Sequence, residues 1–170
     1  MILSGPQILN EVERRRIVID PFDTTQLNPN SYNYRLGGKL RTPPNGILDP
    51  KQEQVWDEID IPEHGIVLFP SRLYLGHTLE RMGSDYFVTS LIGRSSIGRL
   101  GLYVQLAADL GHTGAIHNWT LELVATQPIR LYKGMILGQV SFWQTYGDIK
   151  LYSGKYGTTP LPLESQKLVE

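Results

Sequence analysis

The sequence predicts an all-β protein, an antiparallel sandwich or barrel preceded by one short helix. Seventeen Gly and eleven Pro are spread along the 170 residues, between short runs rich in Val, Ile, Leu, Tyr and Thr. This pattern is typical of strands that are joined by turns. No helix-length periodic segment separates the runs, and parallel strands need such crossovers. We therefore expect the strands to pair antiparallel.

The one helix is expected near the N-terminus. Ser4 is placed to cap it, with Gln7 three residues further on. The apolar face of the helix would consist of Ile8, Leu9 and Val12, which have helical spacing. We therefore expect a short amphipathic helix.

The runs that have the length and composition of strands follow this helix. They are residues 17–19, 32–36, 66–69, 73–78, 86–91, 102–106, 119–125, 129–132 and 136–143. Residues 42–62 contain several prolines and are expected to form a long surface excursion. The tail from residue 153 has little to pack and is expected to be a mobile flap.

A chain of this length is expected to fold as one domain over residues 1–170, with a helix region at 1–16 and a tail at 153–170. A domain of this size buries about 70% of its unfolded surface, so it needs neither a disulfide nor a structural metal. The chain has no cysteine. A disulfide framework, a thiolate zinc site, an iron–sulfur cluster and a cysteine nucleophile are therefore excluded.

The charges nearly balance, with sixteen Lys and Arg against seventeen Asp and Glu. Such a chain has no global positive field to hold polymeric nucleic acid. No stretch approaches the roughly 20 apolar residues that span a bilayer. We therefore expect a cytoplasmic protein with neither nucleic acid nor membrane as its partner.

The densest polar motif is GRSSIGRLGL at residues 93–102. Glycines allow close backbone approach, serines supply short donors and arginines bind phosphate with two parallel hydrogen bonds. The motif is not a P-loop, because no Gly-Lys-Ser/Thr ending is present. An anion site and a polar turn between strands both fit this composition.

A second motif is WTLEL at residues 119–123. In a strand, Glu122 shares one face with Thr120, while Leu121 and Leu123 share the opposite face. Glu122 then either faces solvent or lies in a pocket where it exchanges protons with a substrate.

The four histidines do not have the spacing of a metal site. His64 and His77 lie on different segments, and only His112 and His117 are close, without an HExxH pattern. No zinc is expected. The chain also lacks a GxSxG motif, which argues against a serine hydrolase.

Three motifs together carry a resemblance to a known family: residues 93–102, the Glu122 that follows Arg99 by 23 positions, and NPNSYNYRLG at residues 28–37. The chain resembles the dCTP deaminase family within the dUTPase-like superfamily. The similarity is nearly end to end. Further landmarks are MILSGPQIL at the start, Asp20-Pro21-Phe22, LYLGHTLE at 73–80, PIRLYKGMILGQVSF at 128–142 and YSGKYG at 152–157.

The resemblance implies a distorted β-barrel of the dUTPase-like, or β-clip, type. It implies a homotrimer with active sites between subunits and a C-terminal tail that closes over the nucleotide. The implied reaction is hydrolytic deamination of dCTP, or a close cytosine nucleotide, to dUTP and ammonia without a protein-bound metal. Mg²⁺ would accompany the triphosphate. The known alternative for cytosine deamination uses His and Cys zinc ligands, and the lack of cysteine argues against it.

The resemblance also implies roles for individual residues. Glu122 falls on the catalytic glutamate, which takes a proton from the water attacking C4 and returns protons to N3 and the departing ammonia. Ser95 and Arg99 fall on the residues that position this water and stabilise the charges around it. The implied substrate-binding residues are Arg94, Ser96, Ala108, His112, Trp119, Gln139, Tyr152, Lys155 and Tyr156. Among them, Arg94, Ser96, Gln139, Lys155 and Tyr156 match contacts on the triphosphate side.

The chain departs from the family pattern at several positions. In the family segment Asp-x-Gly-aromatic-x-Gly, His112 replaces the Asp, Ala115 the aromatic residue and His117 the second Gly. In relatives that hydrolyse dUTP this Asp helps to hold the sugar 3′-hydroxyl and the attacking water. A neutral imidazole does not reproduce a carboxylate base, which argues against pyrophosphate release from dUTP. Asn33 replaces another family Asp, and residues 157–159 lack the usual tail Gln.

Two other functions stay open. One is a nucleotide pyrophosphatase that acts on dUTP or a related triphosphate. The other is a non-enzymatic nucleotide-binding or regulatory module, in which Glu122→Gln would change nothing measurable. In a deaminase the same substitution is expected to abolish turnover.

Overall fold

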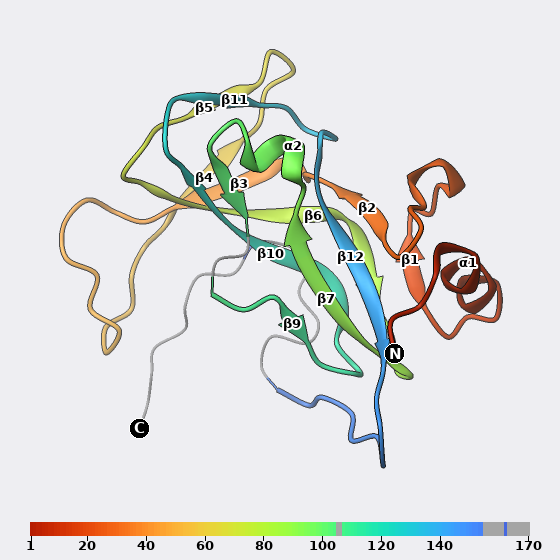
Figure 1. Ribbon diagram of the computed structural model, residues 1–170. Coiled ribbons are helices and arrows are strands. Elements are labelled where there is room, and N and C mark those ends of the chain that lie inside the picture. Colours follow the sequence, from red (N-terminus) through yellow and green to blue (C-terminus); the bar gives the residue numbers. More distant parts are fainter. Residues whose placement is uncertain (105–106, 155–161, 163–170) are drawn as a thin grey trace.

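The computed structural model describes residues 1–104, 107–154 and 162, and strands make up most of its regular structure (Figure 1). No helix among these residues is long and apolar enough to cross a membrane. The elements in chain order are α1 (Gly5–Glu13), β1 (Val18–Asp20), the 3₁₀ turn η1 (Thr24–Gln26), β2 (Tyr32–Arg35), β3 (Lys39–Thr42), β4 (Asp57–Asp60), β5 (Ile66–Leu68), β6 (Leu73–Gly83), β7 (Phe87–Gly93), α2 (Ser95–Gly98), β8 (Leu102–Val104), β9 (Leu110–Gly111), β10 (Ile116–Ala125), β11 (Ile129–Leu131) and β12 (Ile136–Gln144).

The strands form three sheets. A six-stranded sheet has the order β4-β3-β6-β10-β8, with β1 also paired to β6. A four-stranded sheet has the order β2-β12-β7-β9, and β5 pairs with β11. Every ladder between these strands is antiparallel, as expected from the absence of crossover helices.

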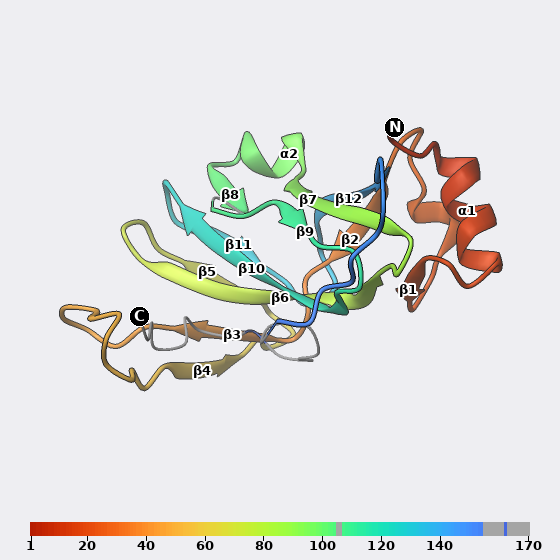
Figure 2. The same ribbon diagram turned by 90° about the horizontal axis from the view of Figure 1, so that it is seen from below.

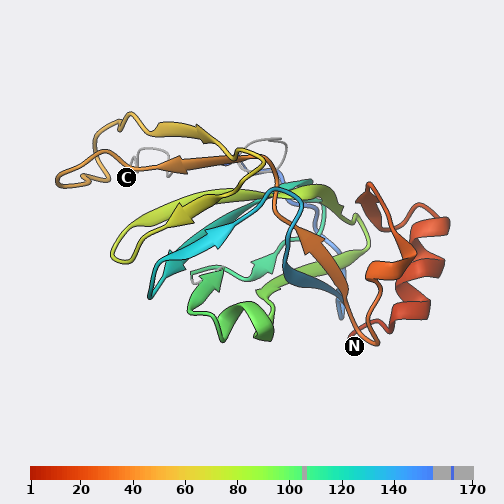
Figure 3. The same cartoon turned by 90° about the horizontal axis from the view of Figure 1, so that it is seen from above.

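The sheets are stacked in layers, with α1 at one end of the stack (Figures 2 and 3). The β3–β4 hairpin lies on one side and the layer with β7, β9 and α2 lies on the other. The all-β expectation is confirmed. Over the described residues, however, the sheets do not close into a barrel, because pairing stops at β4 and β8 in one sheet and at β2 and β9 in the other.

Helix α1 begins where its sequence predicts. The Ser4 hydroxyl accepts a hydrogen bond from the Gln7 backbone N–H at 3.4 Å, which caps the first turn. Ile8 is fully buried on the apolar face. Glu11 is also buried, where its carboxylate binds the Arg16 guanidinium at 2.5 and 2.6 Å. The helix is thus held to the segment that leads into β1 by packing and by an ion pair in which the Glu11 carboxylate is buried and the Arg16 side chain is 39% exposed.

The core lies between the sheets and is built from large side chains of β2, β7, β10 and β12. Tyr32, Tyr34, Leu91, Leu121 and Phe142 are all fully buried. The Tyr34 hydroxyl donates to the Ile92 carbonyl at 3.0 Å, so its polar atom is satisfied within the core. These contacts hold β12 and β7 rigidly beside β2.

The β3–β4 hairpin is the main departure from the expected elements. Residues 57–60 fall inside the segment expected to be a surface excursion, yet they form β4 and pair with β3. The two strands are joined by the Lys39–Glu58 ion pair and by an Arg41–Glu58 contact of 3.6 Å. Charged side chains outnumber apolar ones here, so the pattern of β-branched and aromatic residues that identifies strands is missing.

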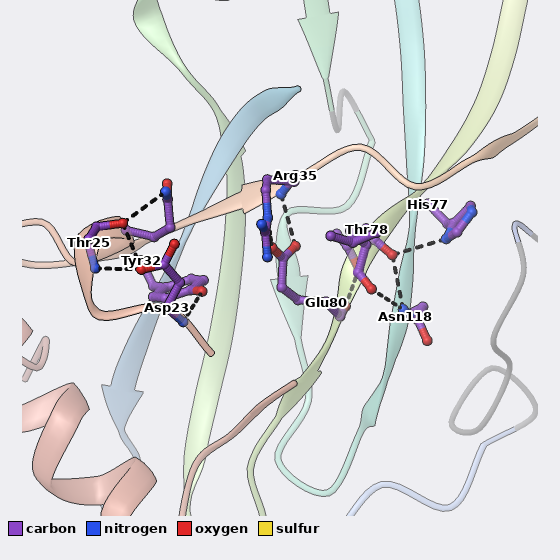
Figure 4. Close-up of polar contacts among 10 residues, drawn as sticks. Asp23, Thr25, Tyr32, Arg35, His77, Thr78, Glu80 and Asn118 are labelled. Carbon is purple, nitrogen blue, oxygen red and sulfur yellow. Dashed lines mark hydrogen bonds and ion pairs between the residues drawn. The ribbon is translucent and has the colours of Figure 1, made fainter. Parts of the chain in front are cut away.

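Strands β6 and β10 form a long ladder with one irregularity. The register shifts between Asn118 and Thr120, and the opposing residues of β6 bulge away from β10. The Asn118 side-chain amide donates to the Thr78 and Leu79 carbonyls, both at 3.0 Å (Figure 4). His77 Nδ1 lies 3.0 Å from the Thr78 carbonyl, and burial lowers the pKa of His77. Polar side chains therefore replace the ladder bonds that the bulge removes.

A buried ion pair connects the two large sheets beside this bulge. The fully buried Glu80 of β6 accepts from Arg35 Nε at 2.6 Å and from the Arg35 backbone N–H at 2.9 Å (Figure 4). Both carboxylate oxygens of Glu80 are used. The pair fixes β2 against β6, and with it the strands that position the candidate site.

Candidate active site

The turn at residues 94–99 exposes four polar side chains. Strand β7 ends at Gly93, and the single turn α2 follows. Ile97 is buried and anchors the turn, whereas Arg94, Ser95, Ser96 and Arg99 are all exposed. Two guanidiniums and two hydroxyls are thus available to an external ligand. Exposure of these groups fits both the anion site and the polar turn that the sequence leaves open.

Glu122 lies on β10 with its side chain on the face away from the core. Leu121 and Leu123 are fully buried on the opposite face, while Glu122 is half-buried. The Ala107 backbone N–H donates to Glu122 Oε2 at 3.1 Å. The exposed Ala108 follows directly, so this loop lies beside the carboxylate. Glu122 is therefore held in one orientation at an accessible position.

The turn that carries Ser95 and Arg99 leads into β8 at the end of the β8–β10 ladder that lies away from Glu122. Leu102, which follows the turn, pairs with Ala125 of β10. Glu122 lies three residues further along β10, which corresponds to about 10 Å of strand. Over residues 1–104 and 107–154, no hydrogen bond or ion pair joins Glu122 to Ser95 or Arg99. Within the described part of one chain, Glu122 is therefore not in direct polar contact with either of the other two candidate catalytic side chains.

The loop that carries His112 contacts the segment that precedes the tail. The Tyr152 backbone N–H donates to the Thr113 carbonyl at 2.8 Å, and the His112 and Tyr152 rings stack at 5.3 Å with 22° between their planes. A cavity of about 420 Å³ lies there, lined by both rings and by apolar residues including Leu110 and Ile149. His112 and Tyr152, far apart in sequence, thus share one pocket, but Glu122 does not line it.

A second ring pair lies next to this loop. The His117 ring lies 4.2 Å from the Trp119 ring, with 35° between their planes. The Trp119 indole N–H donates to the Met82 carbonyl at 2.9 Å, and its ring packs against the core. Burial lowers the pKa of His117, so its imidazole is neutral near neutral pH. Trp119 therefore has a packing role in this chain that the motif alone does not indicate.

Gln139 of β12 belongs to a polar cluster that sequence reasoning missed. The Ser31 hydroxyl donates to Gln139 Oε1 at 2.6 Å, and the Asn28 side-chain amide donates to Ser31 Oγ at 3.1 Å and to Asn33 Oδ1 at 2.9 Å. Ser31 and Asn33 are each only 7% exposed. The one available signal was the run of Asn and Ser in residues 28–33, which is unusual just before a buried strand.

Two expected binding residues, Lys155 and Tyr156, lie outside the described residues. Within the described part of the chain, no three His, Asp or Glu side chains converge to hold a metal ion. The polar side chains that the turn exposes are Arg94, Ser95, Ser96 and Arg99, and Gln139 lies on the neighbouring strand β12.

The family model and the similar proteins point to the same family. The family model described as dCTP deaminase-like matches residues 2–145. A protein of Hathewaya histolytica named "dCTP deaminase, dUMP-forming" is 45% identical over 157 residues, which cover 92% of this chain and 91% of that protein. One of Cytophaga hutchinsonii with the same name is 44% identical and is 90% covered. A "dCTP deaminase" of Rhodopirellula baltica is 42% identical over 148 residues, covering 87% of this chain and 74% of that protein.

One solved structure has a similar fold. The 2′-deoxycytidine 5′-triphosphate deaminase of Agrobacterium tumefaciens matches with a TM-score of 0.66 over 83% of this chain, at 23% identity. This chain spans 47% of the length of that one. The likeness supports the arrangement of the strands.

Proposed function

The chain belongs to the dCTP deaminase-like family, and from this premise we propose that it deaminates dCTP to dUTP and ammonia with Glu122 as the proton carrier. The observation that carries the proposal is the position of Glu122, a half-buried carboxylate on the outer face of β10 with one backbone N–H on Oε2. Relatives named "dCTP deaminase, dUMP-forming" match over about nine-tenths of both chains, which supports deamination of dCTP.

The chemistry requires a group that first removes and then returns protons. Glu122 takes a proton from the water whose oxygen bonds to C4 of cytosine. It delivers this proton to N3, then takes the proton of the new C4 hydroxyl and passes it to the 4-amino group, which leaves as ammonia while the C4 carbonyl forms. The Ala107 N–H holds Oε2, and among the described residues no donor occupies Oε1, so this oxygen is placed to contact the water.

Ser95 and Arg99 are proposed to reach Glu122 from a second subunit. About 10 Å of strand separates Glu122 from the end of the ladder at which α2 enters, and the turn exposes both side chains. A homotrimer with heterologous contacts would bring the turn of one copy to the β10 strand of the next. Arg99 would then stabilise negative charge on the attacking oxygen, and Ser95 would orient the water.

Subunit mixing tests this arrangement. We expect Glu122→Gln and Arg99→Ala each to be inactive alone. If the two residues come from different chains, trimers re-formed from an equal mixture regain about a quarter of wild-type activity, because random pairing makes about a quarter of the sites intact. A mixture that stays inactive while forming mixed trimers would place both residues in one subunit.

The triphosphate is proposed to bind Arg94, Ser96 and Gln139, with Lys155 and Tyr156 of the tail, and Mg²⁺ is carried by the substrate. Of these residues, Arg94 is expected to bind phosphate most strongly, because its guanidinium can bind a phosphate with two hydrogen bonds. His112 and Tyr152 are proposed to face the sugar.

A second candidate function is release of pyrophosphate from the dUTP product to give dUMP. The names of several relatives favour it, since they are called dUMP-forming. His112 argues against it, because an imidazole does not reproduce the carboxylate that could activate a water toward phosphorus. The stacking of His112 on Tyr152 also occupies one face of its ring.

Product analysis decides between these functions. The protein is incubated with Mg²⁺ and, separately, dCTP, CTP, dCMP or dUTP, and the nucleotides are separated by ion exchange while ammonia and pyrophosphate are assayed. Ammonia together with dUTP supports the deaminase. Equal amounts of ammonia and pyrophosphate, with dUMP, show the second function as well. Nucleotide binding without any product would point to a binding module instead.

A further inference from the structure

The hydrogen bonds of the polar cluster around Gln139 run in one direction. This direction decides which end of the Gln139 amide an anionic ligand would meet. Ser31 Oγ accepts a hydrogen bond from the Asn28 amide at 3.1 Å, so its single proton is directed to Gln139 Oε1 at 2.6 Å. The carbonyl end of the Gln139 side chain is thereby held toward Ser31. Its NH₂ end, the donor end, points away from the cluster.

Gln139 lies in a cross-strand row that leads toward the turn at residues 94–99. Asn33 pairs with Gln139 across β2 and β12, and Gln139 pairs with Ile92 of β7. Side chains in one cross-strand row share a face, and Arg94, two residues beyond Ile92, continues on that face. The Arg94 backbone N–H donates to the Leu137 carbonyl at 3.0 Å, which fixes the turn against β12.

The row runs from a buried end to an exposed end. Asn33 is 7% exposed, Gln139 is half-buried, Ile92 is 47% exposed and Arg94 is exposed. An amide that is free to rotate would present either its oxygen or its NH₂ to a ligand here. An oxygen would repel phosphate, whereas the NH₂ group donates to it.

We propose that Asn28 and Ser31 are positioning residues for triphosphate binding, which orient the Gln139 amide so that its N–H groups face the phosphates beside Arg94. This inference rests on the proposed function. Neither residue touches the substrate, and both act through Gln139. The cluster sets the affinity for the triphosphate and leaves the chemical step at C4 unchanged.

The test is a double-mutant cycle on Ser31 and Gln139, read as kcat and KM for dCTP with Mg²⁺. Ser31→Ala removes the donor that holds Gln139 Oε1, and we expect KM to rise about 3- to 10-fold, the effect of one hydrogen bond, with kcat within twofold. In a Gln139→Ala background the same change at Ser31 is expected to have no further effect, because its target is gone. Ser141→Ala, two residues further along β12, is the matched control and should leave both constants unchanged.

A purely structural role for Ser31 predicts a different pattern. The effects of the two substitutions would then add, and Ser31→Ala would lower the melting temperature without a selective change in KM. Additive effects, a lower melting temperature without a selective change in KM, or an unchanged KM in Ser31→Ala would each overturn the proposal. Deamination by the wild type would still leave the proposed function standing.

Binding measured without turnover separates the two proposals further. In Glu122→Gln, calorimetric titration with dCTP and Mg²⁺ is expected to give a dissociation constant that rises by the same factor when Ser31→Ala is added. A wild type that binds dCTP but releases no ammonia would reject the deaminase and keep the positioning role. No binding of dCTP by either protein would reject both.

Discussion

The buried Arg35–Glu80 pair gives the sharpest prediction for stability. Glu80 is fully buried and accepts two N–H donors of Arg35, at 2.6 and 2.9 Å. In Glu80→Gln, one oxygen becomes an NH₂ group that cannot accept either bond, and the Arg35 guanidinium loses its counter-charge. Breaking a buried pair from one side typically costs about 3–5 kcal/mol. A domain of this size is stable by only about 5–15 kcal/mol, so the loss is large.

The assay is the free energy of unfolding from guanidinium denaturation, with Glu58→Gln as the control. Glu58 pairs with Lys39 at the surface, where the two side chains are 38% and 36% exposed, so the same chemical change there should cost about 0–1 kcal/mol. Replacing both Arg35 and Glu80 with apolar residues should cost less than Glu80→Gln alone. If Glu80→Gln costs no more than the control, the pair does not join the sheets as described.

Three further predictions concern other parts of the fold. The hydrogen bonds from Arg16 lower the pKa of Glu11, so this pair stabilises the protein above pH about 4.3 and loses its effect as the pH falls further. In Glu11→Gln, the free energy of unfolding measured from pH 3 to 6 should therefore fall less with acid than in the wild type. Asn118→Ala removes the donor to the Leu79 carbonyl and leaves only His77 beside the Thr78 carbonyl, and it should cost about 1–3 kcal/mol in denaturant unfolding; no change would mean that water satisfies the bulge. Gly114 has φ +94°, and a Cβ there would lie 2.9 Å from the Tyr152 backbone N, so Gly114→Ala should cost about 1–2 kcal/mol and speed amide exchange at Tyr152. Unchanged exchange would contradict the docking of the segment around Tyr152.

Local patterns predicted the elements that local physics decides. The Ser4 cap and the apolar spacing predicted where α1 begins and which face it buries, and the runs of β-branched and aromatic residues identified most strands. The sequence patterns did not predict strands β3 and β4, because the pairing of these strands depends on charges that meet only across the hairpin, as in Lys39 and Glu58. A pattern within one strand does not show its partner.

The sequence proposes candidate site residues one by one, whereas their arrangement comes from the fold. Glu122 stood out in its motif, yet its exposure depends on the register of β10 with β6 and β8, which only the fold shows. The direction of β8 makes the turn enter at the end of the β8–β10 ladder that lies away from Glu122. Ser31 carried no signal of its own, because its partner Gln139 lies 108 residues away.

The most direct test of the account is the rate of ammonia release from dCTP by Glu122→Gln, compared with the wild type and with Glu13→Gln, an exposed carboxylate on α1. Loss of a general acid–base group typically lowers a rate by about 10²–10⁴-fold, and we predict a fall in that range for Glu122→Gln with an unchanged far-UV spectrum. Glu13→Gln should match the wild type. A folded Glu122→Gln protein that releases ammonia at the wild-type rate would contradict the assignment of Glu122 as the proton carrier.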